Sequence, residues 1–145
     1  MTIPASKSKF EIKAQDDGAL TLRLHGVIGG PGATATDIEE ALNAYGEAKH
    51  LTLHIHSDGG SVMEGYAIYN TLKRRFGENI TTVVDGLAAS MASYLFMLGS
   101  KRVMPANTWL MIHGPYGGFQ GRPEELRNFA DLLEQVRSEM LATMQ

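Results

Sequence analysis

The sequence predicts a layered α/β fold in one domain, because strand-like and helix-like patterns alternate along its 145 residues. Segment 50–56 places Leu51, Leu53 and Ile55 between polar residues, which is the period of a strand with two different faces. Glycine-bearing turns separate this strand, and the β-branched strand at 80–84, from helix-like segments. Strands that alternate with helices in this order form sheets with right-handed crossover connections.

The other elements are expected in chain order around these two strands. Residues 1–8 have no pattern and are expected to be a flexible N-terminus. Thr36 and Glu39 form a capping-box pattern that opens a helix to about residue 48, and Pro123 suits the first position of a last helix. Asp85-Gly86 is expected to be a turn. The remaining expected strands are 10–14, 20–25, 102–104 and 108–112, and the remaining helices 62–76 and 89–98.

Composition excludes several classes of protein. The chain has no cysteine, so disulfides, thiolate catalysis and cysteine-ligated zinc are excluded. A net charge of −3 gives no electrostatic reason to expect nucleic acid or a membrane surface as partner. The first nine residues lack the apolar core of a signal peptide, and no apolar stretch is long enough to span a bilayer. A cytoplasmic protein is therefore expected.

Two glycine-bearing strand-to-helix turns are the most informative feature for function. They lie at Gly59-Gly60 and at residues 86–91. Glycine lets a ligand approach the backbone, and a helix N-terminus leaves amide hydrogens without partners. Two such amides facing one point form an oxyanion hole, and Ser90 lies at the second turn. Residue types alone also allow Ser90 to be an ordinary helix-start serine.

Histidines supply the candidate bases and metal ligands. His113 ends a predicted strand and opens a glycine-rich loop, where its side chain can reach a neighbouring strand end. A lone histidine in such a place can also be structural. His54 and His56 share one face of a strand, but no third ligand is spaced to complete a metal site, so we expect a polar sheet face and no metal.

Three sequence blocks together resemble the Clp-type (ClpP-like) serine peptidases. The blocks are residues 57–61 with 65–70, residues 86–93, and residues 111–115 followed by Gly117-Gly118. They occur in the family's order, and 23 positions separate Ser90 from His113. The resemblance covers about residues 20–145. It implies a ClpP/crotonase-like layered βαβ superhelix with mixed sheets and a long C-terminal helix, with residues 9–145 forming the peptidase domain.

The resemblance also implies roles for individual residues in the hydrolysis of peptide bonds. Ser90 would be the nucleophile and His113 its general base, and the amides of Gly60 and Met91 would form the oxyanion hole. Glycine-rich strand edges would pair with an extended polypeptide substrate without any cofactor. The residues expected at these edges are Gly59, Ser61, Gly117 and Gly118.

The chain departs from the family pattern at two places. Asp58 stands where the family usually has proline, and we expect its carboxylate to point to solvent, since it would oppose a developing oxyanion. The family's orienting aspartate would follow the last helix, beyond Gln145, and Asp85, Asp131 and Glu64 do not match its position. We therefore expect the sequence to be a piece truncated within that helix and feebly active or inactive by itself.

The last helix carries an apolar stripe formed by Leu126, Phe129, Leu133, Val136 and Met140. Such a stripe covers the chain's own core or meets another subunit, and the resemblance implies a ring-forming homo-oligomer. The short N-terminal part and residues 83–90 resemble the phage and prophage branch, the head-maturation proteases. Phage capsid proteins or an unfoldase are then possible partners.

Two other kinds of function remain open from the sequence. One is a crotonase-like acyl-CoA enzyme, which also binds an oxyanion with two backbone amides but would not need Ser90 and His113. The other is a non-catalytic assembly module that keeps the fold and the apolar stripe.

Overall fold

The computed structural model describes residues 10–145, so the predicted flexible N-terminus at 1–8 lies outside the described residues. Within these described residues, six strands and four helices follow one another in a mixed order that confirms the α/β class. Their bounds are β1 Glu11–Ala14, β2 Leu20–His25, α1 Ala35–Asn43, β3 Leu51–Ser57, α2 Val62–Phe76, β4 Ile80–Ala89, α3 Met91–Phe96, β5 Lys101–Val103, β6 Trp109–Met111 and α4 Pro123–Met144.

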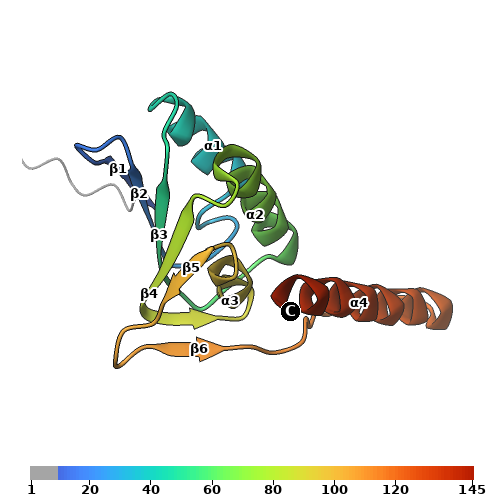
Figure 1. The fold of residues 1–145 in the computed structure, drawn as a ribbon. Coiled ribbons are helices and arrows are strands. Elements are labelled where there is room, and N and C mark those ends of the chain that lie inside the picture. Colours follow the sequence, from blue (N-terminus) through green and yellow to red (C-terminus); the bar gives the residue numbers. More distant parts are fainter. Residues whose placement is uncertain (1–9) are drawn as a thin grey trace, which may run out of the picture.

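The strands form one mixed sheet with helices packed on one side of it (Figure 1). β1 pairs antiparallel with β2, whereas β2, β3, β4 and β5 are parallel neighbours. β4 has two partners on the same side, since residues 81–83 pair with β5 and residues 87–89 pair with β6. This arrangement confirms the predicted mixed sheet with crossover helices.

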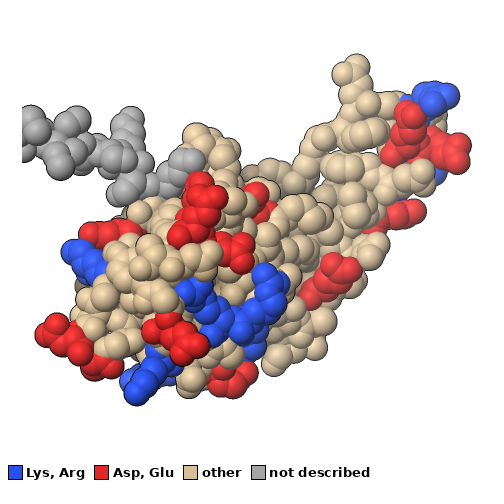
Figure 2. Space-filling model, turned by 90° about the horizontal axis from the view of Figure 1, so that it is seen from above, with Lys and Arg blue, Asp and Glu red and all other residues tan. Residues whose placement is uncertain are grey.

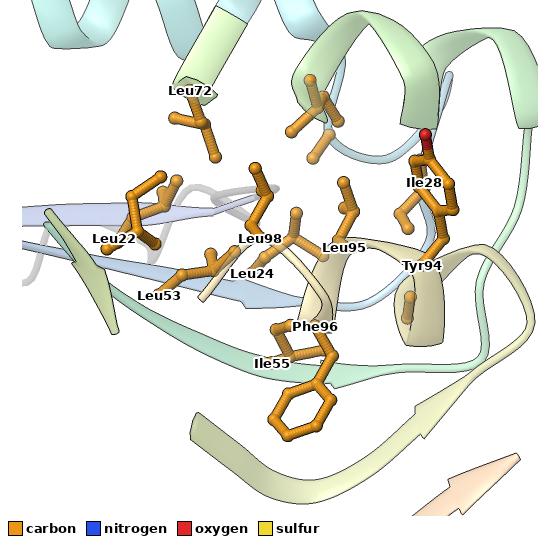
Figure 3. Close-up of a cluster of buried hydrophobic side chains, with 14 of the residues drawn as sticks. Leu22, Leu24, Ile28, Leu53, Ile55, Leu72, Tyr94, Leu95, Phe96 and Leu98 are labelled. Atoms are coloured by element: carbon orange, nitrogen blue, oxygen red, sulfur yellow. The ribbon is translucent and has the colours of Figure 1, made fainter. Parts of the chain in front are cut away.

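The core lies between the sheet and the helices α1, α2 and α3. Alternate residues of the strands point to this side, such as Leu22 and Leu24 of β2 and Ile55 of β3, and each is fully buried. Figure 3 shows them facing Leu72 of α2 and Leu95 of α3. Burying a side chain of this size contributes about 1.5–3 kcal/mol, so this layer fixes the strand order on which the site depends.

Several predicted boundaries are wrong, and helix α1 also ends at Asn43 and not near residue 48. Helix α1 is capped by Thr34, whose hydroxyl accepts from the amide of Asp37, and not by Thr36. The expected turn at Asp85-Gly86 is part of a strand, because β4 continues through an irregularity to Ala89. Helix α3 consequently begins at Met91 and ends at Phe96, and is shorter than the segment 89–98 that the sequence indicates.

Helix α4 and the loop before it form an arm that projects from the body (Figures 1 and 2). The helix begins at Pro123, where a Glu125 carboxylate oxygen accepts from the amide of Arg122. Its C-terminal half returns to the body, and only there are helix residues buried, at Val136 and Met140. Among residues 10–145, no helix is both long and apolar enough to cross a bilayer.

Candidate active site

A pocket forms where the chain leaves β3, β4 and β6. Ser90, Gly60 and His113 all line it, so the structure brings together the nucleophile, one oxyanion donor and the base that the sequence predicts. These strands are parallel, and their carboxyl ends therefore meet at one edge of the sheet. Other lining residues that the sequence did not indicate are Val62, Met111, Pro115 and Tyr116.

Ser90 lies on a tight strand-to-helix turn that holds its backbone and leaves its hydroxyl free. Its φ of 56° is unusual for a residue other than glycine, and strained backbone of this kind clusters at active sites. The amide of Ser90 donates to the Met111 carbonyl at 2.8 Å, and its carbonyl accepts from the Ser93 hydroxyl at 2.5 Å. Although Ser90 occupies the N-cap position of α3, its hydroxyl makes no capping bond.

The Gly59-Gly60 turn packs directly against the Ser90 turn. Gly59 has φ +101°, and a β-carbon there would lie 2.7 Å from the Ser90 β-carbon. The bonds of this turn to Ile28 use the Gly59 carbonyl and the Ser61 amide, each at 2.9 Å. In the described part of the chain, the amides of Gly60 and Met91 donate to no acceptor. Both amides are therefore available as donors for an oxyanion hole, although Gly60 lines the pocket and the buried Met91 does not.

The tautomer of His113 is set by its own loop. Nδ1 lies 2.6 Å from the Gly114 carbonyl oxygen, which can only accept, so Nδ1 carries the proton. In the neutral ring Nε2 then keeps its lone pair, as a general base needs. The ring packs against Tyr116 with centroids 5.3 Å apart. Among residues 10–145 no hydrogen bond joins His113 to Ser90, and such bonds often shorten only when substrate binds.

The four residues expected to bind substrate do not lie together in this pocket. Gly117 and Gly118 do not line the pocket, and Gly117 lies against the Phe129 ring of α4. Gly59 and Ser61 use their backbone on Ile28, and Ser61 also caps α2 by accepting from the Glu64 amide at 3.2 Å. Gly60 is therefore the residue of its turn with a free amide, and the substrate-binding roles of the four others stay predictions.

Asp58 is exposed, as expected for its side chain, yet it also lines the pocket that contains Ser90 and His113. In the described part of the chain, no Lys or Arg lines this pocket. The described residues offer no hydrogen bond or ion pair to the Asp58 carboxylate. Within residues 10–145, Asp58 is therefore a negative charge in the pocket lining without a basic partner.

Two of the other candidate carboxylates, Glu64 and Asp85, are engaged by groups other than His113. Glu64 accepts from the Ala35 amide at 2.8 Å. Asp85 receives hydrogen bonds from His54 Nδ1 at 2.7 Å and His25 Nε2 at 2.8 Å. Partial burial raises the pKa of Asp85, but the bonds from the two histidines outweigh burial and leave the pKa below its ordinary value.

The cluster at Asp85 shows what sequence reasoning missed on the polar sheet face. His25 and His56 are register partners on β2 and β3, so the parallel pairing of these strands gathers three histidines near one carboxylate. The signal was present in the spacing, since each histidine stands at an alternating position near the end of its strand. No group of residues within 10–145 has the arrangement of a metal site.

A second pocket opens on the other side of His113, between the end of β6 and α4. Its wall includes Ile112, Pro115 and the α4 residues Met140, Leu141 and Met144. The wall is mostly apolar, so it can accept an apolar side chain next to the base. Only the return of α4 to the body creates it.

Comparison with known proteins shows the family of the chain. A family model described as Clp protease matches residues 33–145, which include Gly60, Ser90 and His113. The chain is similar to the ATP-dependent Clp protease proteolytic subunit of Porphyromonas gingivalis, with 37% identity over 101 residues, 68% of this chain. The aligned part is 45% of that protein, so the chain spans less than half the length of this curated relative. The chain belongs to the Clp protease family.

Proposed function

We propose that the chain carries the catalytic centre of a serine endopeptidase. One observation carries the proposal: Ser90, with an uncapped hydroxyl, lines the same pocket as His113 and as the free amide of Gly60. Membership in the Clp protease family supports peptidase chemistry, and the geometry supports serine as the nucleophile.

The proposed reaction forms and then hydrolyses an acyl-enzyme. Nε2 of His113 takes the proton of Ser90 Oγ as Oγ attacks the carbonyl carbon of the peptide bond. The amides of Gly60 and Met91 donate to the resulting oxyanion, and each such donor contributes about 3–4 kcal/mol to the transition state. The protonated His113 gives its proton to the leaving amine, and water then releases the acyl group.

The Gly114 carbonyl performs one role of an orienting carboxylate, because it accepts a hydrogen bond from His113. It holds the Nδ1 proton of His113 and thereby the useful tautomer. A neutral carbonyl, however, stabilises the imidazolium cation formed during attack less than a carboxylate does. Turnover by these residues is therefore proposed to be slow, which agrees with the weak activity expected from the sequence.

The proposed substrate is an extended polypeptide. Its backbone would approach the free amide of Gly60. One of its apolar side chains would enter the pocket whose wall includes Met140, Leu141 and Met144. Backbone pairing provides affinity with little selectivity, so selectivity is assigned to the pockets on either side of His113. The further pairing with Gly59, Ser61, Gly117 and Gly118 stays part of this proposal.

A serine-directed phosphonate tests the proposal. We expect it to modify the chain at Ser90, and Ser90→Ala and His113→Ala to abolish the modification. Ser138→Ala removes an exposed hydroxyl from α4 and is the matched control, for which no change is expected. Modification that persists in Ser90→Ala overturns the proposal. A wild-type chain that the phosphonate does not label but that hydrolyses acyl-CoA would favour the crotonase-like enzyme. A wild-type chain that is not labelled and only assembles would favour the non-catalytic module.

The finer assignment is to the phage and prophage branch, acting in the cytoplasm on capsid precursors. Its support is the likeness of residues 83–90 and of the short N-terminal part to head-maturation proteases. It predicts that capsid precursor chains are cut without an unfoldase. Cleavage only in the presence of an ATP-driven unfoldase would instead place the protein with the degradative peptidases.

Self-association is the last part of the proposal. Large apolar side chains are exposed along β6 and the arm, including Trp109 at 74% and Tyr116 at 82% exposure. On α4 the N-terminal half of the predicted stripe stays uncovered by the body, whereas Val136 and Met140 are buried against it. We propose that copies of the chain cover this surface in a ring-forming homo-oligomer.

A further inference from the structure

An irregularity in β4 determines how the two halves of the candidate active site meet. Ile55 pairs with Val84, and two residues later on β3 Ser57 pairs with Ala88. One β3 residue, His56, therefore stands opposite three β4 residues, Asp85, Gly86 and Leu87. Extra residues on one strand bend it and re-aim the side chains that follow.

This bulge is the point at which β4 changes partner. Before it, residues 81–83 pair with β5, and from its last residue, Leu87, to Ala89 the strand pairs with β6. Ser90 comes directly after the second pairing and donates its amide to the Met111 carbonyl of β6. His113 follows β6 two residues later, so the bulge sets the relative position of Ser90 and His113.

The ring of the exposed residue His56 lies against the bulge. Its Nδ1 lies 3.2 Å from the Leu87 amide, which can only donate, so Nδ1 is the unprotonated acceptor. Gly86 leaves room for this ring, since a β-carbon at residue 86 would lie 2.7 Å from His56 Nδ1 and 2.9 Å from Cε1. The neighbouring histidines His25 and His54 bind Asp85, and thus the first residue of the same bulge.

We propose that His56 is a positioning residue of the peptidase, whose ring nitrogen holds the Leu87 amide and so fixes the bulge that aligns Ser90 with His113. The inference rests on the proposed function for its effect on rate. The geometry of the bulge stands without that function. His56 does not line the pocket with Ser90, so it acts through the backbone of β4.

Substitutions at His56 separate the hydrogen bond from the bulk of the ring. In His56→Asn the side-chain oxygen is attached to Cγ, as Nδ1 is, and can accept from the Leu87 amide. We expect His56→Ala to slow phosphonate labelling of Ser90 by about ten- to a hundredfold, since small misplacements of reacting groups have effects of that size. His56→Asn is expected to restore most of the rate, and with a peptide substrate the loss in His56→Ala should fall on kcat and leave KM nearly unchanged.

Gly86→Ala provides an independent route to the same change. The added methyl group is expected to push the His56 ring off the Leu87 amide and to slow labelling in the wild-type background. In His56→Ala there is no ring to displace, so Gly86→Ala should add little. His50→Ala is the matched control, because His50, directly before β3, contacts Thr81 of β4 at 3.0 Å, away from the bulge, and no change in rate is expected.

Amide hydrogen exchange tests the role of His56 in the bulge independently of catalytic activity. We expect faster exchange of the Leu87 and Ser90 amides in His56→Ala, and near wild-type exchange in His56→Asn and His50→Ala. If the wild type is not labelled at all, the proposed function fails, and exchange alone then decides whether His56 holds the bulge. Unchanged exchange and rate in folded His56→Ala, or equal slowing in His56→Asn and His56→Ala, would overturn the inference.

Discussion

Hydrogen bonds to its backbone hold Ser90 in place, so its hydroxyl is not needed to hold the turn. Met111 takes the amide and Ser93 binds the carbonyl, so the turn is held without any bond from the side chain. His113 is prepared in a similar way, because the Gly114 carbonyl fixes the proton on Nδ1. At the scale of single residues, the candidate site is assembled largely by backbone groups.

The sequence could predict which residues meet at this site but not how they are held. Ser90, His113 and Gly60 belong to motifs whose order and spacing resemble a known family, and the structure places them in one pocket. The Gly114 and Ile28 contacts involve backbone atoms that every residue carries, so residue types give no signal for them. The charge at Asp58 was readable because it replaces an expected proline.

Asp58→Asn is expected to raise the rate of Ser90 labelling at neutral pH by about two- to fivefold. The Asp58 carboxylate lines the pocket without a partner among the described residues and opposes a developing oxyanion, and an exposed charge has effects of up to about 1 kcal/mol. Asp131→Asn on α4 removes the same charge from an exposed position outside this pocket and serves as the control. A slower rate in Asp58→Asn would mean that the carboxylate assists catalysis.

Asp85→Asn is expected to lower the free energy of unfolding by about 1 kcal/mol near neutral pH, since the amide replaces a carboxylate that accepts from two histidines. The folded-state pKa of Asp85 is lowered, so its contribution is complete above the ordinary carboxyl pKa and is lost as pH falls through the folded value. Urea unfolding should therefore show the difference between variant and wild type shrinking below about pH 4. A difference that stays constant down to pH 3 would contradict this assignment.

Among the elements, β4 shows best where sequence patterns stop being informative. Residues 80–84 have the β-branched alternation of a strand and were predicted as one. Residues 85–89 lack that alternation and contain Asp-Gly, which is typical of a turn. Tertiary contacts decide otherwise, because His25, His54 and His56 bind the irregular segment and β6 pairs with its end.

Helix α4 is attached to the body by few side chains, and one of them should dominate its docking. Met140 is 8% exposed and lies against the core, so Met140→Ala is expected to cost about 2 kcal/mol, the low end for a buried methionine. Leu141→Ala, at a position 44% exposed, should change stability by less than about 0.5 kcal/mol. Urea unfolding measures both. Equal losses for the two variants would show that the helix does not dock through this face.

At the scale of the whole molecule, the body buries its apolar side chains in a core, whereas the arm leaves many of its apolar side chains exposed. In Figure 2 charged side chains are scattered over the body and also lie along the arm and at its tip, where the arm extends away from the body. The arm buries little of its own apolar surface, as Leu126 at 42% and Leu132 at 47% exposure show. Exposed apolar surface of this extent is typical of an interaction site. Periodicity predicted the stripe, but which half would cover the core depends on the loop that precedes α4.

Leu132→Glu is expected to shift the chain toward smaller species in sedimentation velocity, because a charge would be buried in the proposed contact between copies. Ala130→Glu introduces the same charge about 200° around the helix and is the control, with no shift expected. A wild-type chain that sediments as a monomer at high concentration would refute self-association through this surface. Equal shifts in both variants would place the contact elsewhere.

A crystal structure of the chain after reaction with a phosphonate tests the central claim most directly. The account predicts phosphorus bonded to Ser90 Oγ, one phosphonyl oxygen within hydrogen-bonding distance of the amides of Gly60 and Met91, and Nε2 of His113 facing the adduct. An adduct on another residue, or a phosphonyl oxygen turned away from both amides with His113 out of reach, would contradict it.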